Sequence, residues 1–117
     1  MVHADTFLSH FNDSVDNVEI TTDGSKVGLG AVLTQTYDSK IHTIAFASRA
    51  LRPNEQNSTS SELEALAVCW ALIKFRQIIF GRHITIFTDH SALCYLNNHN
   101  GRKLLSQLGK HSYTLGN

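Results

Sequence analysis

The chain has 117 residues, enough for one folded domain with a single hydrophobic core but too few for several. Ten basic and ten acidic residues give a formal net charge of zero, which excludes the strongly basic surface that draws many free-standing proteins to nucleic acid. With 42% hydrophobic residues and one proline, the composition is that of a globular protein and not of a disordered or repetitive one.

The cysteines and the N-terminus indicate the cellular compartment. Cys69 and Cys94 are too few for a disulfide framework and lack the paired spacing of metal ligands, so both are expected to be core residues in a reducing environment. The first residues lack the basic stretch and apolar run of a secretory signal, and no later segment has enough apolar residues to span a membrane. The sequence therefore predicts a cytoplasmic or nuclear protein that is not secreted and has no membrane partner.

The first half of the chain predicts three strands. Residues 1–16 show no clean period and are expected to lead into a domain that occupies 17–117. Apolar and polar residues alternate over 18–23, and β-prone runs follow over 28–35 and 41–48 after short turns. Short turns between successive strands favour an antiparallel three-strand meander.

An apolar segment over 62–80 predicts the main helix. Ser60 or Ser61 can cap its start, and Gly81 stands where a glycine that ends a helix belongs. Because the segment is apolar around most of its circumference, we expect it to lie against a sheet. Alternation resumes over 83–89 and predicts a fourth strand. Two short helices are expected beyond it, over 91–96 and 103–108, and the last residues match no pattern.

This order of elements predicts an α/β fold with one mixed sheet. A strand that follows a helical crossover returns parallel to the earlier strand with right-handed topology, so 83–89 should lie parallel to 18–23 and beside it. Asp23 and Asp89 end these two strands, and each follows a threonine. Both side chains are therefore expected at the same carboxyl edge of the sheet, where open α/β sheets usually bind ligands.

A third carboxylate is expected from the start of the helix. Glu64 shares a helical stripe with apolar residues, whereas Glu62 lies on another side and is explained as first-turn charge that favours the helix dipole. The stripe consists of Val68, Ala71, Leu72 and Phe75. Clustered carboxylates repel one another unless cations neutralise them, and their oxygen atoms suit Mg²⁺ or Mn²⁺. The pattern predicts a two-metal site that can hydrolyse a phosphodiester without a covalent intermediate.

Several blocks of sequence resemble one family when taken in order and spacing. TTDGSKVGLGAVLTQ, IAFASRAL, NSTSSELEALAVCWALIKFRQIIFGR and ITIFTDHSALCYL, over roughly residues 7–96, resemble the ribonuclease H domain of Ty3/gypsy-type retrotransposon reverse transcriptases. The resemblance implies that Asp23, Glu64 and Asp89 are catalytic metal ligands and that Ser25 and His90 contact substrate.

The same resemblance implies an activity and its partners. The expected reaction is hydrolysis of the RNA strand of an RNA:DNA hybrid with Mg²⁺ or Mn²⁺, two ions in all. The expected partner is an adjacent reverse transcriptase polymerase domain within a retroelement polyprotein, in a cytoplasmic virus-like particle or in the nucleus.

One part of the family pattern is missing. Related domains continue through a fifth strand and a final helix that bring a fourth metal-binding aspartate, whereas no acidic residue follows Asp89 here. We therefore expect a ribonuclease H-like domain without the usual final strand and helix, in which 83–89 is an exposed sheet edge. Such a chain is either a truncated gene copy or a piece of a longer polyprotein.

Other interpretations fit parts of the pattern. The missing carboxylate and the neutral charge favour a noncatalytic ribonuclease H-like module, or a remnant, that supports an adjacent polymerase domain. A phosphotransfer receiver also holds Mg²⁺ at strand ends, but its alternating βα units do not match a meander. Seven histidines lack the short spacing of a zinc site. Taken singly, Asp23 before Gly24 is also typical of a turn, and Asp89 of a helix cap.

Overall fold

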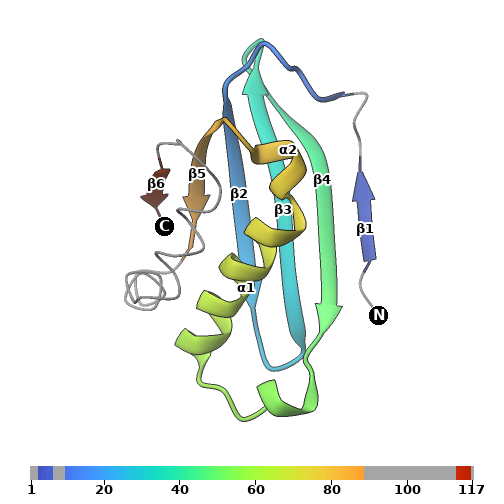
Figure 1. Cartoon of the computed structure of the whole chain (residues 1–117), viewed down its shortest axis with the longest axis vertical. Coiled ribbons are helices and arrows are strands. Elements are labelled where there is room, and N and C mark those ends of the chain that lie inside the picture. The colour runs from blue at the N-terminus through green and yellow to red at the C-terminus, as the bar shows by residue number, and fades with distance from the viewer. Residues whose placement is uncertain (1–2, 7–9, 89–112, 117) are drawn as a thin grey trace.

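The computed structural model describes residues 3–6, 10–88 and 113–116, and side chains within 10–88. Its elements, in chain order, are β1 (His3–Thr6), β2 (Asn17–Gly24), β3 (Gly28–Tyr37), β4 (Lys40–Ala50), the short 3-10 helix η2 (Pro53–Glu55), α1 (Ser60–Lys74), α2 (Arg76–Ile79), β5 (His83–Phe87) and β6 (Tyr113–Gly116). The strands form one sheet in the order β1-β4-β3-β2-β5-β6, with α1 lying across it (Figure 1). No helix in the described ranges is long and apolar enough to cross a membrane.

The centre of the sheet has the predicted topology. β2 pairs antiparallel with β3, and β3 pairs antiparallel with β4, which confirms the meander. β5 returns parallel to β2, with Val18 opposite Ile84 and Thr21 opposite Phe87. The predicted mixed sheet with a helical crossover is therefore confirmed, and the carboxyl ends of β2 and β5 lie at the same edge.

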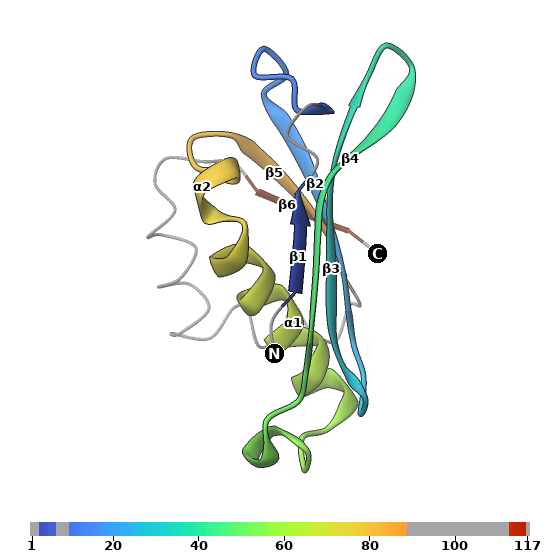
Figure 2. The ribbon, with the colours of Figure 1, turned by 90° about the vertical axis from the view of Figure 1, so that its right-hand side faces the viewer.

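The hydrophobic core lies between the sheet and the two helices, which cover the same face (Figure 2). Val18 and Ile20 are fully buried on this face, whereas Thr21 and Asp23 are exposed. The strand alternation read from the sequence is thus confirmed. The predicted apolar stripe of the helix is buried too, through Val68, Ala71, Leu72 and Phe75.

The N-cap of α1 lies one residue before Ser60, the first of the two caps that the sequence predicts. Thr59 is the N-cap, and its hydroxyl accepts a hydrogen bond from the Glu62 backbone N–H (3.2 Å). The Glu62 carboxylate in turn accepts from the Thr59 backbone N–H (2.8 Å), so the pair forms a capping box. The prediction of Ser60 or Ser61 as the cap is therefore wrong, because the exchange with Glu62 makes Thr59 the N-cap and both serines are already inside the helix.

The predicted single helix over 62–80 is interrupted. α1 ends at Lys74, and Phe75 leaves helical geometry (φ −98°, ψ 8°) before α2 begins. Phe75 is 3% exposed, so its ring stays in the core while the chain changes direction. Gly81 adopts a positive φ of 80°, the left-handed conformation expected of a glycine that follows a helix.

The sheet is wider than the sequence predicts. β1 pairs antiparallel with β4, so the segment expected to lead into the domain supplies a strand. β6 pairs parallel with β5, so the expectations of no strand beyond 83–89 and of an exposed edge there are both wrong. Both outer strands are only four residues long, too short for a readable alternation. The helices expected over 91–96 and 103–108 lie outside the described residues.

Gln35 ties the segment before β2 to the sheet. Its side chain is fully buried, and its Oε1 accepts from the Asn12 backbone N–H (2.9 Å). Its Nε2 donates to the backbone carbonyls of Asn12 (3.1 Å) and Val15 (3.2 Å). The buried Gln35 amide thus supplies hydrogen-bond partners to backbone groups of Asn12 and Val15, which lie outside the strands. The structured region therefore begins before residue 17.

Candidate functional site

Asp23 lies at the carboxyl end of β2, on the sheet face away from the helices. It is exposed and stands opposite Gly30 of β3, which in turn stands opposite Ser48 of β4. A hollow of about 460 Å³ opens beside it, with Ser25, Ser48 and Arg49 among its lining residues. The carboxylate therefore borders a space that a ligand can enter.

Gly24 brings the end of β2 against the start of α1. A Cβ atom on this residue would lie 2.2 Å from the backbone oxygen of Leu63 and 2.9 Å from the backbone nitrogen of Glu64. Contacts that short do not occur, so the packing requires glycine here. Since Asp23 precedes this contact and Glu64 is part of it, the structure brings these two predicted site residues to the same edge of the sheet.

Glu64 is half-buried, and its Oε2 atom is shielded from solvent. Asp23 and Glu64 thus offer carboxylate oxygens, which are hard donors, from the same edge of the sheet, and a hollow opens on the side of Asp23. Mg²⁺ and Mn²⁺ prefer such donors and retain water ligands. The two described carboxylates fit a divalent ion of this class.

Asp89 and His90, the other predicted site residues on the fourth strand, lie outside the described residues. In the part of the chain that the structure describes, no group of three or more His, Cys, Asp or Glu side chains could hold a metal ion. The structure therefore brings the chain segments that carry Asp23 and Glu64 to one sheet edge, and the metal-binding role of all three carboxylates stays a prediction.

Ser25 has a role in the turn after β2. Its hydroxyl accepts from the Val27 backbone N–H (3.2 Å) and is 3.4 Å from the Gly28 carbonyl, to which it can donate. It is exposed and also lines the hollow beside Asp23. These hydrogen bonds within the turn are enough to explain a serine at position 25. Its predicted contact with substrate stays a prediction.

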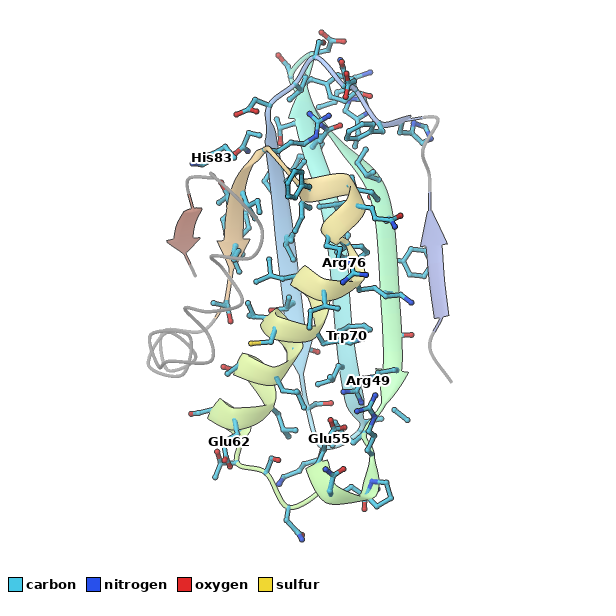
Figure 3. The ribbon with its side chains drawn as sticks, in the orientation of Figure 1. Arg49, Glu55, Glu62, Trp70, Arg76 and His83 are labelled. Atoms are coloured by element: carbon cyan, nitrogen blue, oxygen red, sulfur yellow. The ribbon has the colours of Figure 1, made fainter. Side chains whose placement is uncertain are left out.

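The loop from β4 to α1 is held by an ion pair that the sequence reading missed (Figure 3). Arg49 donates through Nη1 and Nη2 to the two carboxylate oxygens of Glu55, at 2.8 and 2.9 Å. Glu55 also accepts from the Arg52 backbone N–H (2.7 Å), and the Arg49 guanidinium lies 6.0 Å from the ring centre of Trp70. Ion pairs across an irregular loop have no regular spacing in the sequence, so no sequence pattern predicts this one.

This pair changes the acidity of its carboxyl group. The hydrogen bonds from Arg49 are the largest cause that lowers the pKa of Glu55, from 4.5 to about 2. Burial opposes this shift, while the Arg52 backbone N–H assists it. The same hydrogen bonds raise the pKa of Arg49. Glu55 is therefore ionised throughout the neutral and mildly acidic range.

Comparison with known proteins assigns the family. The sequence matches the family described as "RNase H-like domain found in reverse transcriptase" over residues 13–116. The chain belongs to this family. This RNase H-like domain is 48% identical over 77 residues to the retrovirus-related Pol polyprotein from transposon 412 of Drosophila melanogaster, an alignment of 66% of the chain. It is 44% identical over 78 residues, again 66% of the chain, to that from transposon gypsy of the same species. The predicted resemblance to Ty3/gypsy-type elements is confirmed.

The RNase H-like domain spans only 6% and 7% of the length of these two polyproteins. Among solved structures it is similar to the foamy viral protease-reverse transcriptase in complex with dsDNA, with a TM-score of 0.63 and 16% identity over 91% of this chain and 24% of that chain. The dRH form in complex with ds DNA gives a TM-score of 0.64 and 17% identity over 87% of this chain and 21% of that chain. At such low identity the likeness shows the fold, and it confirms the predicted ribonuclease H-like class.

Replacement of Gly24 tests the contact between β2 and α1. Gly24→Ala places a methyl group into the backbone of Leu63 and Glu64, and we expect a loss of at least about 2 kcal/mol in the free energy of unfolding. Gly30→Ala is the matched control, because a Cβ there has no atom within 4 Å and alanine is the better strand residue. Urea unfolding measures both variants. Equal stability of the two would contradict the close approach.

The low pKa of Glu55 predicts an acid-dependent loss of stability. Because its pKa is lower in the folded chain than its ordinary 4.5, the stabilisation is present above that value and is lost as the pH falls toward about 2. Urea midpoints of the wild type and Glu55→Gln should therefore converge between pH 5 and pH 2.5, a window set by this shift. A difference between the two proteins that stays constant with pH would show that the ion pair does not supply the shift.

Proposed function

We propose that this RNase H-like domain is a metal-dependent endonuclease, which hydrolyses the RNA strand of RNA:DNA hybrids as part of a retroelement Pol polyprotein. One observation carries the proposal. The contact of Gly24 with the start of α1 brings Asp23 and Glu64 to one edge of the sheet, beside an open hollow. Carboxylates from a strand end and a helix start, on a ribonuclease H-like fold, are the donor set that such hydrolysis needs.

The strand register supports Asp89 as the third carboxylate. Thr21 stands opposite Phe87 in the parallel pair of β2 and β5. Asp23 follows Thr21 by two residues, and Asp89 follows Phe87 by two residues. Continued pairing in the same register would bring both aspartates to the edge that Glu64 reaches from α1.

Divalent Mg²⁺ or Mn²⁺, two ions in all, bound by Asp23, Glu64 and Asp89 would activate water and stabilise the charge on the leaving oxygen. The chain's own contribution is to fix these carboxylates on rigid elements. Asp23 is on a strand paired on both sides, and Glu64 is the fifth residue of a capped helix. The half-buried Glu64 is expected to be the less mobile ligand, and the exposed Asp23 the one that meets incoming substrate.

The hollow beside Asp23 suits the sugar-phosphate backbone of one strand. Ser25 and Ser48 offer hydroxyls along its lining, and glycines keep part of its floor bare of side chains. Contacts with 2′-hydroxyls would favour RNA over DNA, with His90 as a further predicted contact. Two foamy viral relatives of the fold were solved with double-stranded DNA, which supports duplex binding as part of the proposal. Because the net charge is zero, we expect an adjacent polymerase domain to supply much of the affinity.

A second candidate is a noncatalytic module that supports an adjacent polymerase domain. The formal net charge of zero favours it, because a domain without excess positive charge contributes little of its own attraction to a nucleic-acid backbone. The module would still bind hybrid through the same hollow without cleaving it.

Cleavage of an end-labelled RNA:DNA hybrid in Mg²⁺ or Mn²⁺ separates the two candidates. We expect RNA-strand products from the wild type and a loss of at least about 100-fold in Glu64→Gln and Asp23→Asn, since each removes a metal ligand. Glu62→Gln is the control, because its carboxylate lies two residues from Glu64 in α1 but only caps the helix. Equal cleavage by Glu64→Gln would contradict the proposed site. Hybrid binding without cleavage by the folded wild type would favour the noncatalytic module.

A further inference from the structure

The ion pair of Arg49 and Glu55 differs from the other ion pair among the described residues. Both of its side chains are nearly buried, at 7% and 12% exposed. The pair of Arg82 and Asp13 lies at the surface, with the Asp13 side chain 91% exposed. A buried, bidentate pair is geometrically demanding, because two parallel hydrogen bonds fix both the distance and the plane of the two groups.

The pair joins three elements on the route to Glu64. Arg49 is near the end of β4 and Glu55 ends η2, while Trp70, whose ring centre is 6.0 Å from the guanidinium, is in α1. Arg49 also donates to the Ala50 carbonyl (3.0 Å), and Glu55 closes the η2 turn through the Arg52 backbone N–H. The carboxyl end of β4 and the body of α1 are thus held at a fixed separation, with the connecting loop between them.

Trp70 extends this link to the carboxylate edge. It packs against a small core cluster of Leu29, Leu51, Leu63 and Ala67, separate from the main core. Leu63 is 1% exposed, and its backbone is the part of α1 that touches Gly24. Contacts therefore run from Arg49 through Trp70 and this cluster to the helix turn that carries Glu64.

The pair imposes a geometry in addition to the acid-sensitive stability that it contributes. A buried ion pair often contributes no more than an apolar pair of the same size, because both charges lose their hydration. Arg49 Nε is buried and has no hydrogen-bond acceptor in the described part of the chain, which adds to that cost. What the pair supplies that an apolar contact would not is a fixed geometry between β4, η2 and α1.

We propose that Arg49 and Glu55, supported by Trp70, are positioning residues that set the separation of the Glu64 and Asp23 carboxylates for a divalent ion. This inference rests on the proposed function, because it concerns the same metal site. It predicts that loosening the pair weakens metal binding although neither residue touches the metal. Partners of this kind commonly change metal affinity about 10- to 100-fold.

Calorimetric titration of the whole chain with Mn²⁺ alone tests the inference. We expect the Mn²⁺ dissociation constant to rise about 10-fold in Arg49→Lys, which loses the bidentate fork, and in Glu55→Gln, which loses the charge. Asp13→Asn removes the other ion pair and should leave the constant unchanged. Titrations are run at a temperature where circular dichroism shows every variant folded, with thermal unfolding recorded separately. Trp70→Phe tests the same support if Arg49→Lys fails to fold.

The outcomes separate this inference from the proposed function. Weaker Mn²⁺ binding in the folded variants supports the positioning role, even if the wild type cleaves no hybrid. A lower unfolding temperature with an unchanged Mn²⁺ constant would show a purely structural pair and overturn the inference, while cleavage by the wild type would leave the proposed function intact. Absence of Mn²⁺ binding by the wild type would overturn both.

Discussion

The close approach of β2 and α1 at Gly24 is the constraint on which the site depends. No side chain fits between that residue and the backbone of Leu63 and Glu64, so two segments 40 residues apart in sequence meet main chain to main chain. A contact between backbones is less tolerant of displacement than one between long side chains. It gives Asp23 and Glu64 a defined relation before any metal binds, which is the preorganisation that a catalytic site requires.

The rest of the domain supports this contact from two sides. The parallel pairing of β2 with β5 and the antiparallel pairing with β3 hold the strand end, and the capping box of Thr59 and Glu62 fixes where the helix begins. The loop between β4 and α1 is held by a hydrogen bond near one end and an ion pair near the other. Lys26 donates to the Ser58 carbonyl (2.5 Å), and the buried ion pair of Arg49 and Glu55 joins β4 to the loop.

Sequence reasoning predicted those parts of the fold that periodic side-chain patterns determine. Alternation over 18–23 gave the buried face of β2, and the apolar stripe gave the face of α1 and hence the placement of Glu64. The outer strands were missed because edge pairing over four residues depends on exposed backbone groups and leaves no period. Thr59 was missed although Thr59 and Glu62 have the Ser/Thr-x-x-Glu spacing of a capping box, because the two serines that follow Thr59 are also good N-cap residues. The ion pair of Arg49 and Glu55 was missed because it spans an irregular loop.

The central claim is that Asp23 and Glu64 form one divalent metal site, and paramagnetic broadening by Mn²⁺ in an NMR spectrum of the chain tests it most directly. Mn²⁺ broadens amide signals only close to where it binds. We predict that substoichiometric Mn²⁺ broadens the signals of Gly24, Ser25 and Glu64 first, and that Glu64→Gln abolishes this selectivity. Broadening confined to other exposed carboxylates, such as Asp13 and Asp38, with the signal of Gly24 unchanged, would contradict the account.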